Sequence, residues 1–304
     1  MNVQNPSASR GIDIQAVDLV KNYGTGSNMV HALRGVNVSF ERGKFTAIMG
    51  PSGSGKSTLM HTLAGLDSAT SGHILFGGAD LTRMDDKQLT LLRRHKIGFI
   101  FQSFNLLPMF TAEQNILMPL TLAGDKPDRA WFDLLVDTLG LKQRLNHRPN
   151  ELSGGQQQRV AIARALITKP KLVFADEPTG NLDSVSSAEV LGFLKRSVNE
   201  LGQTIVMVTH DAVAASYADR AIVFADGQIV ADEANPTAET MNELLMAERE
   251  RATRTAVTST RADTLARLAG VKDVPNLPIT DAPLPPAGRT GPMRHARAAA
   301  QHAR

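Results

Sequence analysis

The feature that most constrains this chain is a glycine-rich loop between a strand-like apolar run and a helical run. It fits the pattern G-x-x-x-x-G-K-[ST], and its residues are Gly50, Pro51, Ser52, Gly53, Ser54, Gly55, Lys56, Ser57 and Thr58. Glycines let successive backbone N–H groups surround an anion, and the following helix directs its positive end at the same point. Lys56 would reach the β- and γ-phosphates, and the Ser57 hydroxyl would bind Mg²⁺. Because both flanking runs also fit, the sequence predicts a nucleotide-binding site rather than a plain glycine-rich turn.

A second motif is an apolar run that ends in two carboxylates. Leu172–Ala175 predicts a buried strand, and Asp176 and Glu177 follow it directly. At a strand's carboxyl end Asp176 would hold Mg²⁺, directly or through water, and Glu177 would point at the attacking water. The alternative is a surface turn, since Asp-Glu-Pro often ends a strand. The matching phosphate loop upstream favours the functional interpretation.

The order of strand-like and helical patterns predicts the fold class. Runs expected to form buried strands are Phe45–Met49, Ile97–Phe101, Leu172–Ala175, Thr204–Val208 and Ala221–Phe224. Helical stretches lie between them, which indicates an α/β fold with a mainly parallel sheet covered on both faces. The first forty residues instead show three short, glycine-punctuated strands (IDIQAVDLVKNY, VHALRGV and NVSFERG), typical of an antiparallel layer. Residues from about 87 to 150 are helical in pattern and predict a separate helical subdomain.

The two ends of the chain differ in composition from the rest. We expect a flexible segment over residues 1–11, one folded domain over 12–250, and a disordered or loosely helical tail over 251–304. The tail holds nine basic and three acidic residues, whereas residues 1–250 hold 24 and 27. The basic excess therefore belongs to the tail, and the expected domain lacks the charge typical of nucleic-acid binding. Cysteine is absent, which excludes disulfides and cysteine-ligated metal sites.

A third motif resembles the signature motif of the ABC (ATP-binding cassette) ATPases. It comprises Ser153, Gly154, Gly155 and Gln156, preceded by Leu152 and followed by Gln157, Gln158 and Arg159. A serine and two glycines that open a helix offer another anion-binding N-terminus. The resemblance implies that this motif faces the γ-phosphate bound by a second protomer. The competent enzyme would then be a homodimer, or a pair of ATPase subunits, with ATP and Mg²⁺ at two shared sites.

Further residues match this family in the family's order. Gln102 matches the glutamine that contacts the metal and senses a membrane partner, and Asp183 matches a loop that crosses the dimer interface. His210 matches the histidine that contacts the γ-phosphate, and Tyr23 the aromatic residue that stacks on adenine; such stacking contributes roughly 1–3 kcal/mol per base. A lone histidine or tyrosine more often has a structural role. The resemblance covers residues 12–233 and implies the P-loop NTPase fold of ABC type, with Lys56, Glu177 and His210 carrying ATP hydrolysis.

The amino-acid sequences of several segments narrow the resemblance to the lipoprotein-releasing and macrolide-export group of ABC ATPases. These segments are VHALRGV, IGFIFQSFNLLPMFTAEQNILMPL, NELSGGQQQRVAIARAL and ADEPTGNLDS. The group pairs with permeases of few spans and a large extracytoplasmic domain, so we expect a peripheral position on the cytoplasmic face of the membrane. No nucleic-acid partner is expected. The chain has no apolar run long enough to span a membrane and no secretory signal pattern.

A docking surface and two other function classes complete the expectations. The permease would contact exposed residues after Gln102, namely Phe104, Leu106, Leu107, Met109 and Phe110; the alternative is that they form the core of the helical subdomain.

A membrane signalling or cell-wall-remodelling ATPase that moves no solute would use the same machinery. A soluble ABC ATPase of translation or DNA repair is disfavoured, because such proteins usually fuse two cassettes or carry coiled-coil or zinc insertions.

Overall fold

The computed structural model of the chain describes residues 11–268. Its central element is a six-stranded sheet with the strand order β10-β9-β3-β8-β7-β6. The strands are β3 (Phe45–Met49), β6 (Ile97–Phe101), β7 (Leu172–Asp176), β8 (Thr204–Val208), β9 (Arg220–Ala225) and β10 (Gln228–Ala234). All neighbouring pairs run parallel except β9 and β10. The five buried strands expected from the sequence are confirmed, because continuous apolar runs can be buried on both faces of a parallel sheet.

A second, antiparallel sheet lies at the amino-terminal end of the sequence. Its strands are β1 (Ile12–Tyr23), β2 (Val30–Glu41), β4 (Ser71–Phe76) and β5 (Ala79–Asp80), in the order β2-β1-β4-β5. The antiparallel layer is confirmed, but the expectation of three short strands is wrong. The two runs around Gly35 join in one strand, since Gly35 adopts φ 71° and is passed over in the register with β1. A glycine therefore forms a bulge here instead of ending the strand.

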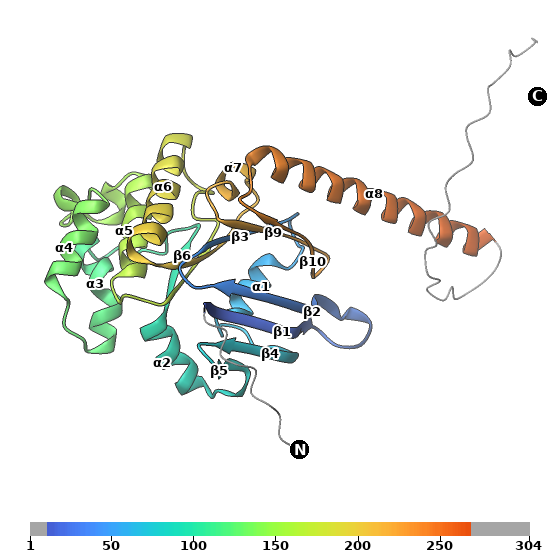
Figure 1. The fold of residues 1–304 in the computed structure, drawn as a ribbon, viewed down its shortest axis with the longest axis horizontal. Coiled ribbons are helices and arrows are strands. Elements are labelled where there is room, and N and C mark those ends of the chain that lie inside the picture. Colours follow the sequence, from blue (N-terminus) through green and yellow to red (C-terminus); the bar gives the residue numbers. More distant parts are fainter. Residues whose placement is uncertain (1–10, 269–304) are drawn as a thin grey trace, which may run out of the picture. The chain divides into compact units, whose positions relative to one another are not determined.

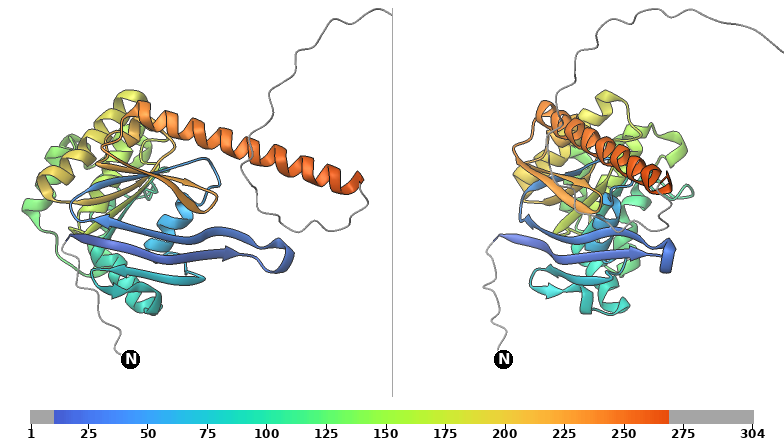
Figure 2. Two further views of the ribbon diagram at one scale, coloured as in Figure 1. Left: turned by 45° about the vertical axis from the view of Figure 1, so that its right-hand side comes forward. Right: turned by 90° about the vertical axis from the view of Figure 1, so that its right-hand side faces the viewer.

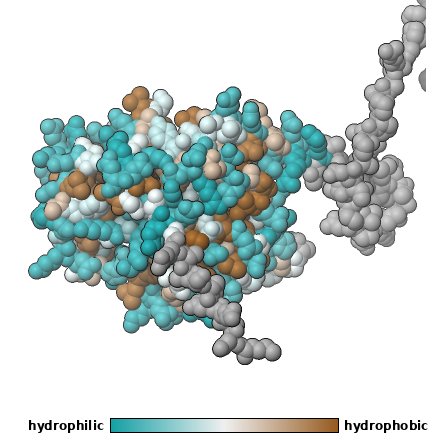
Figure 3. Space-filling model, viewed as in Figure 1, coloured by the Kyte–Doolittle hydropathy of each residue, from teal (hydrophilic) through white to brown (hydrophobic). Residues whose placement is uncertain are grey.

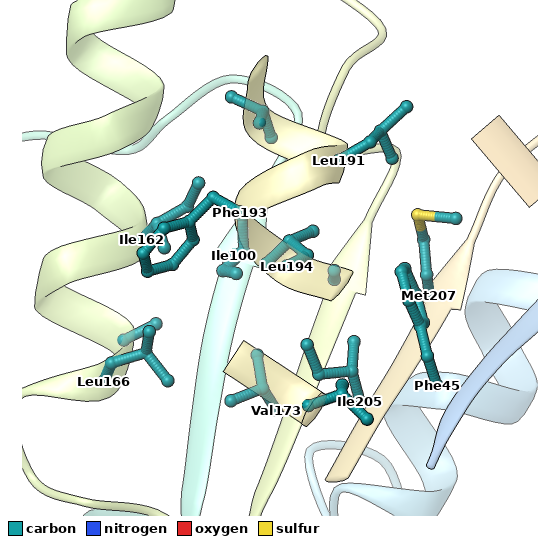
Figure 4. Packing of buried hydrophobic residues seen from close by; sticks show 14 of the residues in the cluster. Phe45, Ile100, Ile162, Leu166, Val173, Leu191, Phe193, Leu194, Ile205 and Met207 are labelled. Atoms are coloured by element: carbon teal, nitrogen blue, oxygen red, sulfur yellow. The ribbon is translucent and has the colours of Figure 1, made fainter. Parts of the chain in front are cut away.

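Helices cover both faces of the six-stranded sheet. Helix α1 (Lys56–Leu63) lies between the two sheets and contacts β1, β2 and β8 (Figure 1). On the other face are α5 (Gly154–Leu166), α6 (Ser184–Leu201) and the short α7 (Ala212–Ala215), as the turned views show (Figure 2). Side chains of α5 and α6 meet those of the sheet in a packed core, with Ile162 and Phe193 opposite Val173 (Figure 4). This layering explains why the inner strands β3, β7 and β8 are buried almost throughout.

The helices outside the sheet follow strand β6. They are α3 (Ala112–Ala123) and α4 (Arg129–Thr138), with the 3-10 turns η3 (Lys142–Arg144) and η4 (Pro149–Glu151). Helix α2 (Asp86–Lys96) precedes β6, and the turns η1 (Gly26–Asn28) and η2 (Leu81–Arg83) belong to the antiparallel part. The range 87–150 expected to be helical thus includes β6, which pairs with β7 in the main sheet. The helices of this range are therefore divided in the sequence by a strand of the main sheet, with α2 before it and α3 and α4 after it.

Helix α8 (Ala238–Leu268) contains the beginning of the predicted tail. Met241 is buried, and Leu244 and Leu245 pack against the main core. Contacts between residues group the chain into two compact units, residues 1–253 and residues 254–304. Residues 251–268 are helical, while the predictions for residues 1–10 and 269–304 lie outside the described residues. None of the helices described between residues 11 and 268 is long and apolar enough to cross a membrane.

Candidate active site

The glycine-rich loop connects β3 to α1 as the sequence predicts. Gly55 is the N-cap of α1 with φ 103°, and Gly50 has φ 149°. A Cβ atom on Gly50 would overlap the Phe224 carbonyl oxygen, and one on Gly55 would overlap that of Ala32. These two positions therefore require glycine for both conformation and space. The result is a loop whose backbone lies tightly against neighbouring strands while α1 begins directly at Lys56.

Lys56 is buried at the base of this loop. Its Nζ atom donates a hydrogen bond to the Pro51 carbonyl oxygen at 2.8 Å, and the residue is only 7% exposed. Burial lowers the pKa of the Lys56 ammonium group, and the carboxylates of Glu177 and Asp176 oppose this effect. The lysine is thus held within the loop and close to both acidic residues.

Asp176 ends β7 beside the first turn of α1. The Ser57 hydroxyl donates to Asp176 Oδ1 across 3.4 Å. Burial raises the pKa of Asp176; among its neighbours, His61 opposes this rise and Glu177 adds to it. A half-buried carboxyl with a raised pKa lacks sufficient compensating positive charge. A divalent cation between Ser57 and Asp176 would supply that charge.

The donor set at this position fits Mg²⁺. A hydroxyl and a carboxylate are hard oxygen ligands, and Mg²⁺ generally uses one or two carboxylates together with substrate phosphates and water. Within residues 11–268, no group of three or more His, Cys, Asp or Glu residues forms a metal cage. The residues present therefore fit a cation that is held partly by its nucleotide.

Glu177 has an unusual backbone conformation immediately after β7. Its φ is 44°, which is the left-handed region that non-glycine residues rarely adopt. Its N–H donates to the Val208 carbonyl oxygen at 2.9 Å, and its own carbonyl oxygen accepts from the Gly180 N–H at 3.0 Å. These bonds fix the turn and direct the side chain to His210, whose Nδ1 lies 2.9 Å from Glu177 Oε1. Glu177 and His210, two of the three predicted catalytic residues, are therefore in contact.

Gln102 follows β6, the edge strand next to β7. The register pairs Phe101 with Asp176, so Gln102 emerges at the same edge of the sheet as the acidic residues. Its backbone carbonyl accepts from Asn181 Nδ2 at 3.0 Å, and its Nε2 donates to Asn181 Oδ1 at 3.4 Å. Gln102 and Asp176 thus lie at neighbouring strand ends, although no direct contact between their side chains is formed.

The signature residues form the beginning of α5. The Ser153 hydroxyl accepts from the Gln156 N–H at 3.3 Å, and Gln156 Oε1 accepts from the Ser153 N–H at 3.0 Å. This reciprocal capping box starts α5, and the Gly154 and Gly155 N–H groups lie at its N-terminal end. Asp183 has a similar role, because its carboxylate caps α6 through the Val185 and Ser186 N–H groups at 3.0 Å each.

An open cavity lies over the glycine-rich loop. Its volume is about 600 Å³, and its lining includes Gly53–Thr58, Tyr23 and His31. Among the residues that the structure describes, Ser153, Gly154, Gly155 and Gln156 do not line this cavity. The loop and Tyr23 thus line one cavity, the acidic residues adjoin the loop through the Ser57–Asp176 hydrogen bond, and the signature motif does not contribute to the lining.

Two residues around this cavity were missed by sequence reasoning. Asp67 Oδ2 accepts a hydrogen bond from the Tyr23 hydroxyl at 2.6 Å, and Asp67 Oδ1 accepts one from Lys21 at 2.6 Å. The i, i+2 spacing of Lys21 and Tyr23, which puts both on one side of β1, was an available signal. Nothing in the sequence pattern connects Asp67 with them.

Comparison with known proteins agrees with this geometry. The profile of the family described as "ABC transporter" matches residues 33–180. The lipoprotein-releasing system ATP-binding protein LolD of Geobacter metallireducens is 49% identical over 221 residues, which cover 72% of this chain and 98% of that protein. The macrolide export ATP-binding/permease protein MacB of Bdellovibrio bacteriovorus is 47% identical over 73% of this chain, but over only 34% of its own length.

Solved structures give the same assignment. A dimeric ATP-binding cassette in a post-hydrolysis state, bound to ADP and Pi, superposes with a TM-score of 0.67 at 40% identity and covers 73% of this chain and 98% of its own. The cbiO1 protein of Clostridium perfringens gives a TM-score of 0.68 at 30% identity, over 85% of this chain and 100% of its own. The predicted ABC-type P-loop fold is confirmed. The chain belongs to the ATP-binding proteins of the ABC transporter family and is an ABC-type ATPase.

Proposed function

We propose that the chain binds ATP with the triphosphate in the loop Gly50–Thr58 and the adenine against Tyr23. The cavity over the loop supports this orientation, because Tyr23 and the loop line the same space. The Tyr23 side chain is part of a residue that is 41% exposed, so its ring is available to a base. Lys56 then neutralises the β- and γ-phosphates, and the N-terminus of α1 stabilises their charge.

Hydrolysis in this proposal depends on Glu177 and His210. Glu177 accepts the proton of the attacking water, and His210, in contact with its carboxylate at 2.9 Å, orients Glu177 and reaches the γ-phosphate. Ser57, Asp176 and Gln102 would hold Mg²⁺, which neutralises charge that develops on the phosphate oxygens. Asp176 is half-buried next to Ser57, and its raised pKa is consistent with a site built for a cation.

A second protomer supplies the remaining contacts to the nucleotide. Ser153, Gly154, Gly155 and Gln156 would face the γ-phosphate held in the partner's loop, and Asp183 would lie at the interface. One observation supports this arrangement: the similar cassette bound to ADP and Pi is dimeric.

The membrane partner is proposed to be a permease of the lipoprotein-release or macrolide-export type, with few spans and a large extracytoplasmic domain. LolD is named for a lipoprotein-releasing system and MacB for macrolide export with a permease. The chain would then act at the cytoplasmic face of the membrane, with its nucleotide cycle driving the permease. The view in Figure 3 shows separate hydrophobic patches on a mainly hydrophilic face, and exposed apolar residues after Gln102 suggest where docking occurs.

The docking segment differs in one respect from the sequence expectation. Leu107 and Met109 are 38% and 61% exposed. Phe104, Leu106 and Phe110 are half-buried instead, and Leu106 packs against the main core. A neighbouring groove of about 470 Å³ is lined by apolar residues that include Leu66, Met118 and Leu122, and by the polar residues Thr90, Arg93, Arg94, Asn105, Arg164 and Thr168. We therefore assign docking to this groove together with Leu107 and Met109.

A link from the docking segment to the signature helix supports its use in coupling. Arg164 of α5 donates to the carbonyl oxygens of Phe104 and Asn105 at 2.7 and 2.5 Å. Ser153 begins the same helix. A displacement of the segment by the permease would therefore be carried along α5 to the nucleotide of the partner protomer.

The observation that carries the proposal is the contact of Glu177 with His210 beside buried Lys56. Its test is Glu177→Gln, which keeps the shape of the side chain but cannot accept the proton. The variant should bind ATP, lose hydrolysis and accumulate as an ATP-bound dimer on size-exclusion chromatography. Asp137→Asn, at an exposed carboxylate on α4, is the matched control and should retain the wild-type rate. Undiminished turnover by Glu177→Gln would refute the assigned role.

The membrane partner needs a separate test. Purification of the tagged chain from membranes should recover an integral permease, and replacing Leu107 and Met109 by serine should reduce that recovery without changing ATPase activity. Recovery of ribosomes or DNA in place of a permease would contradict the proposal.

A further inference from the structure

A polar cluster at the edge of the nucleotide cavity connects β1 with the segment after α1. Its centre is Asp67, whose two carboxylate oxygens accept from the Tyr23 hydroxyl and from Lys21 Nζ, each at 2.6 Å. Lys21 also donates to the Ser68 carbonyl oxygen at 2.7 Å. Burial raises the pKa of Asp67, but the hydrogen bonds from Lys21 and Tyr23 outweigh it, so the pKa lies below its usual value. Both hydrogen bonds are therefore made to an ionised carboxylate.

Lys21 also contacts the aromatic ring itself. Its ammonium nitrogen lies 4.8 Å from the centroid of the Tyr23 ring. The Lys21 side chain is 9% exposed, so the ring has a buried cation on one face. A planar side chain fixed at its hydroxyl and covered on one face has one face left for a ligand.

The surrounding backbone is fixed as well. The Thr70 N–H donates to the Val20 carbonyl oxygen at 2.8 Å, and the Asn22 N–H donates to Thr70 Oγ1 at 2.9 Å. The Leu66 N–H bonds the carbonyl oxygen of His61 in α1 at 2.9 Å. The cluster therefore joins the strand that carries the ring to the helix that begins at the phosphate loop, and it sets the spacing between the two.

We propose that Asp67 and Lys21 are positioning residues that hold the Tyr23 ring in place for the adenine base. This inference rests on the proposed contact between Tyr23 and adenine. The ring of a free tyrosine at a strand end would lose rotational freedom when the base binds. Here the hydrogen bond and the cation restrict the ring before binding, so the base meets an ordered surface and its affinity rises.

The test compares ligands with and without a base. Asp67→Ala removes both hydrogen bonds to the carboxylate, and Tyr23→Phe removes only the hydroxyl while it keeps the ring. Each should raise KM for ATP about fivefold. The kcat should stay unchanged, and so should the inhibition constant of tripolyphosphate, which occupies the phosphate loop and lacks adenine. If Asp67→Ala does not fold, Tyr23→Phe still decides the question.

A double variant separates positioning from direct contact. In a Tyr23→Ala chain there is no ring to hold, so adding Asp67→Ala should raise KM no further. Asp80→Asn is the matched control: Asp80 accepts from His73 at 2.9 Å on the same antiparallel sheet, outside the cavity. This control should keep KM for ATP unchanged.

Two results would overturn the inference. One is an unchanged KM in both Tyr23→Phe and Asp67→Ala. The other is a parallel rise of KM and of the tripolyphosphate inhibition constant, which would mean that the cluster only supports the fold. A Tyr23→Ala chain with normal KM would instead refute the proposed contact of Tyr23 with adenine. The hydrolytic roles of Glu177 and Lys56 would be untouched by that result, because they are tested separately.

Discussion

The fit of the phosphate loop against the neighbouring strands makes one glycine far more sensitive than another. Gly53 and Gly55 both have positive φ, at 78° and 103°. Around an added Cβ on Gly53 there is no atom within 4 Å, whereas one on Gly55 would overlap the Ala32 carbonyl oxygen and lie 3.1 Å from Phe224 Cε1. Replacement of each glycine by alanine therefore separates backbone strain from steric overlap.

The magnitudes follow from these two effects. In a left-handed conformation, a residue with a Cβ destabilises the folded state by about 1–2 kcal/mol. Alanine also lowers the conformational entropy of the unfolded chain, which stabilises the protein by about 0.4–1 kcal/mol. Gly53→Ala should thus lower the free energy of unfolding by about 1 kcal/mol. Gly55→Ala has at least this strain, because its φ is larger, and overlap with the Ala32 backbone adds about 1–3 kcal/mol. We expect a total loss of about 3 kcal/mol.

Urea denaturation followed by circular dichroism measures both losses, and ATP binding by the folded fraction measures the site. Gly55→Ala should also bind ATP poorly, because relief of the overlap must move the N-terminus of α1 and Lys56 with it. Gly53→Ala should bind more nearly like the wild type. Equal losses of stability in the two variants would refute the reasoning, since the overlap with Ala32 and the close approach to Phe224 occur at Gly55 and not at Gly53.

Two further predictions concern groups near the site and in the core. Gln158 is fully buried and donates to the Pro178 carbonyl oxygen at 2.6 Å. Gln158→Met removes this hydrogen bond and loosens the turn after Glu177, so it should lower kcat without raising KM. An unchanged kcat in a steady-state assay would contradict this prediction. Burial raises the pKa of Asp219, but hydrogen bonds from Lys195 and the Phe45 N–H outweigh it and lower the pKa. Asp219 therefore stabilises the fold above its unfolded pKa of about 4, and the stability gap between wild type and Asp219→Asn should close as denaturation is repeated at falling pH.

Much of the candidate site can be proposed from the sequence, because its residues belong to local patterns. The loop from Gly50 to Thr58 needs glycines at defined places, and overlap with Phe224 and Ala32 shows why two of them have no substitute. The apolar strands were predictable for a related reason, as a strand buried on both faces has no polar positions. Such local patterns can be recognised from the residue types alone.

The remaining features depend on residues far apart in the sequence. The two apolar runs around Gly35 form one strand, because pairing with β1 tolerates a bulge that no local pattern distinguishes from a turn. The contact of Asp67 with Tyr23 joins residues 44 positions apart. An aspartate after a helix has many possible partners, and only the packing of α1 against β1 selects this one.

The topology of the sheet explains how distant motifs form one site. The strand order brings β3, β8 and β7 side by side, with β3 parallel to β8 and β8 parallel to β7. Their carboxyl ends therefore lie at one edge, where β3 leads to Lys56, β7 to Glu177 and β8 to His210. Since parallel neighbours need crossover connections, the motifs must be far apart in the chain in order to be adjacent in space. Wide spacing between them is thus a requirement of the site, and a sequence search confined to short windows finds the parts but cannot find their contact.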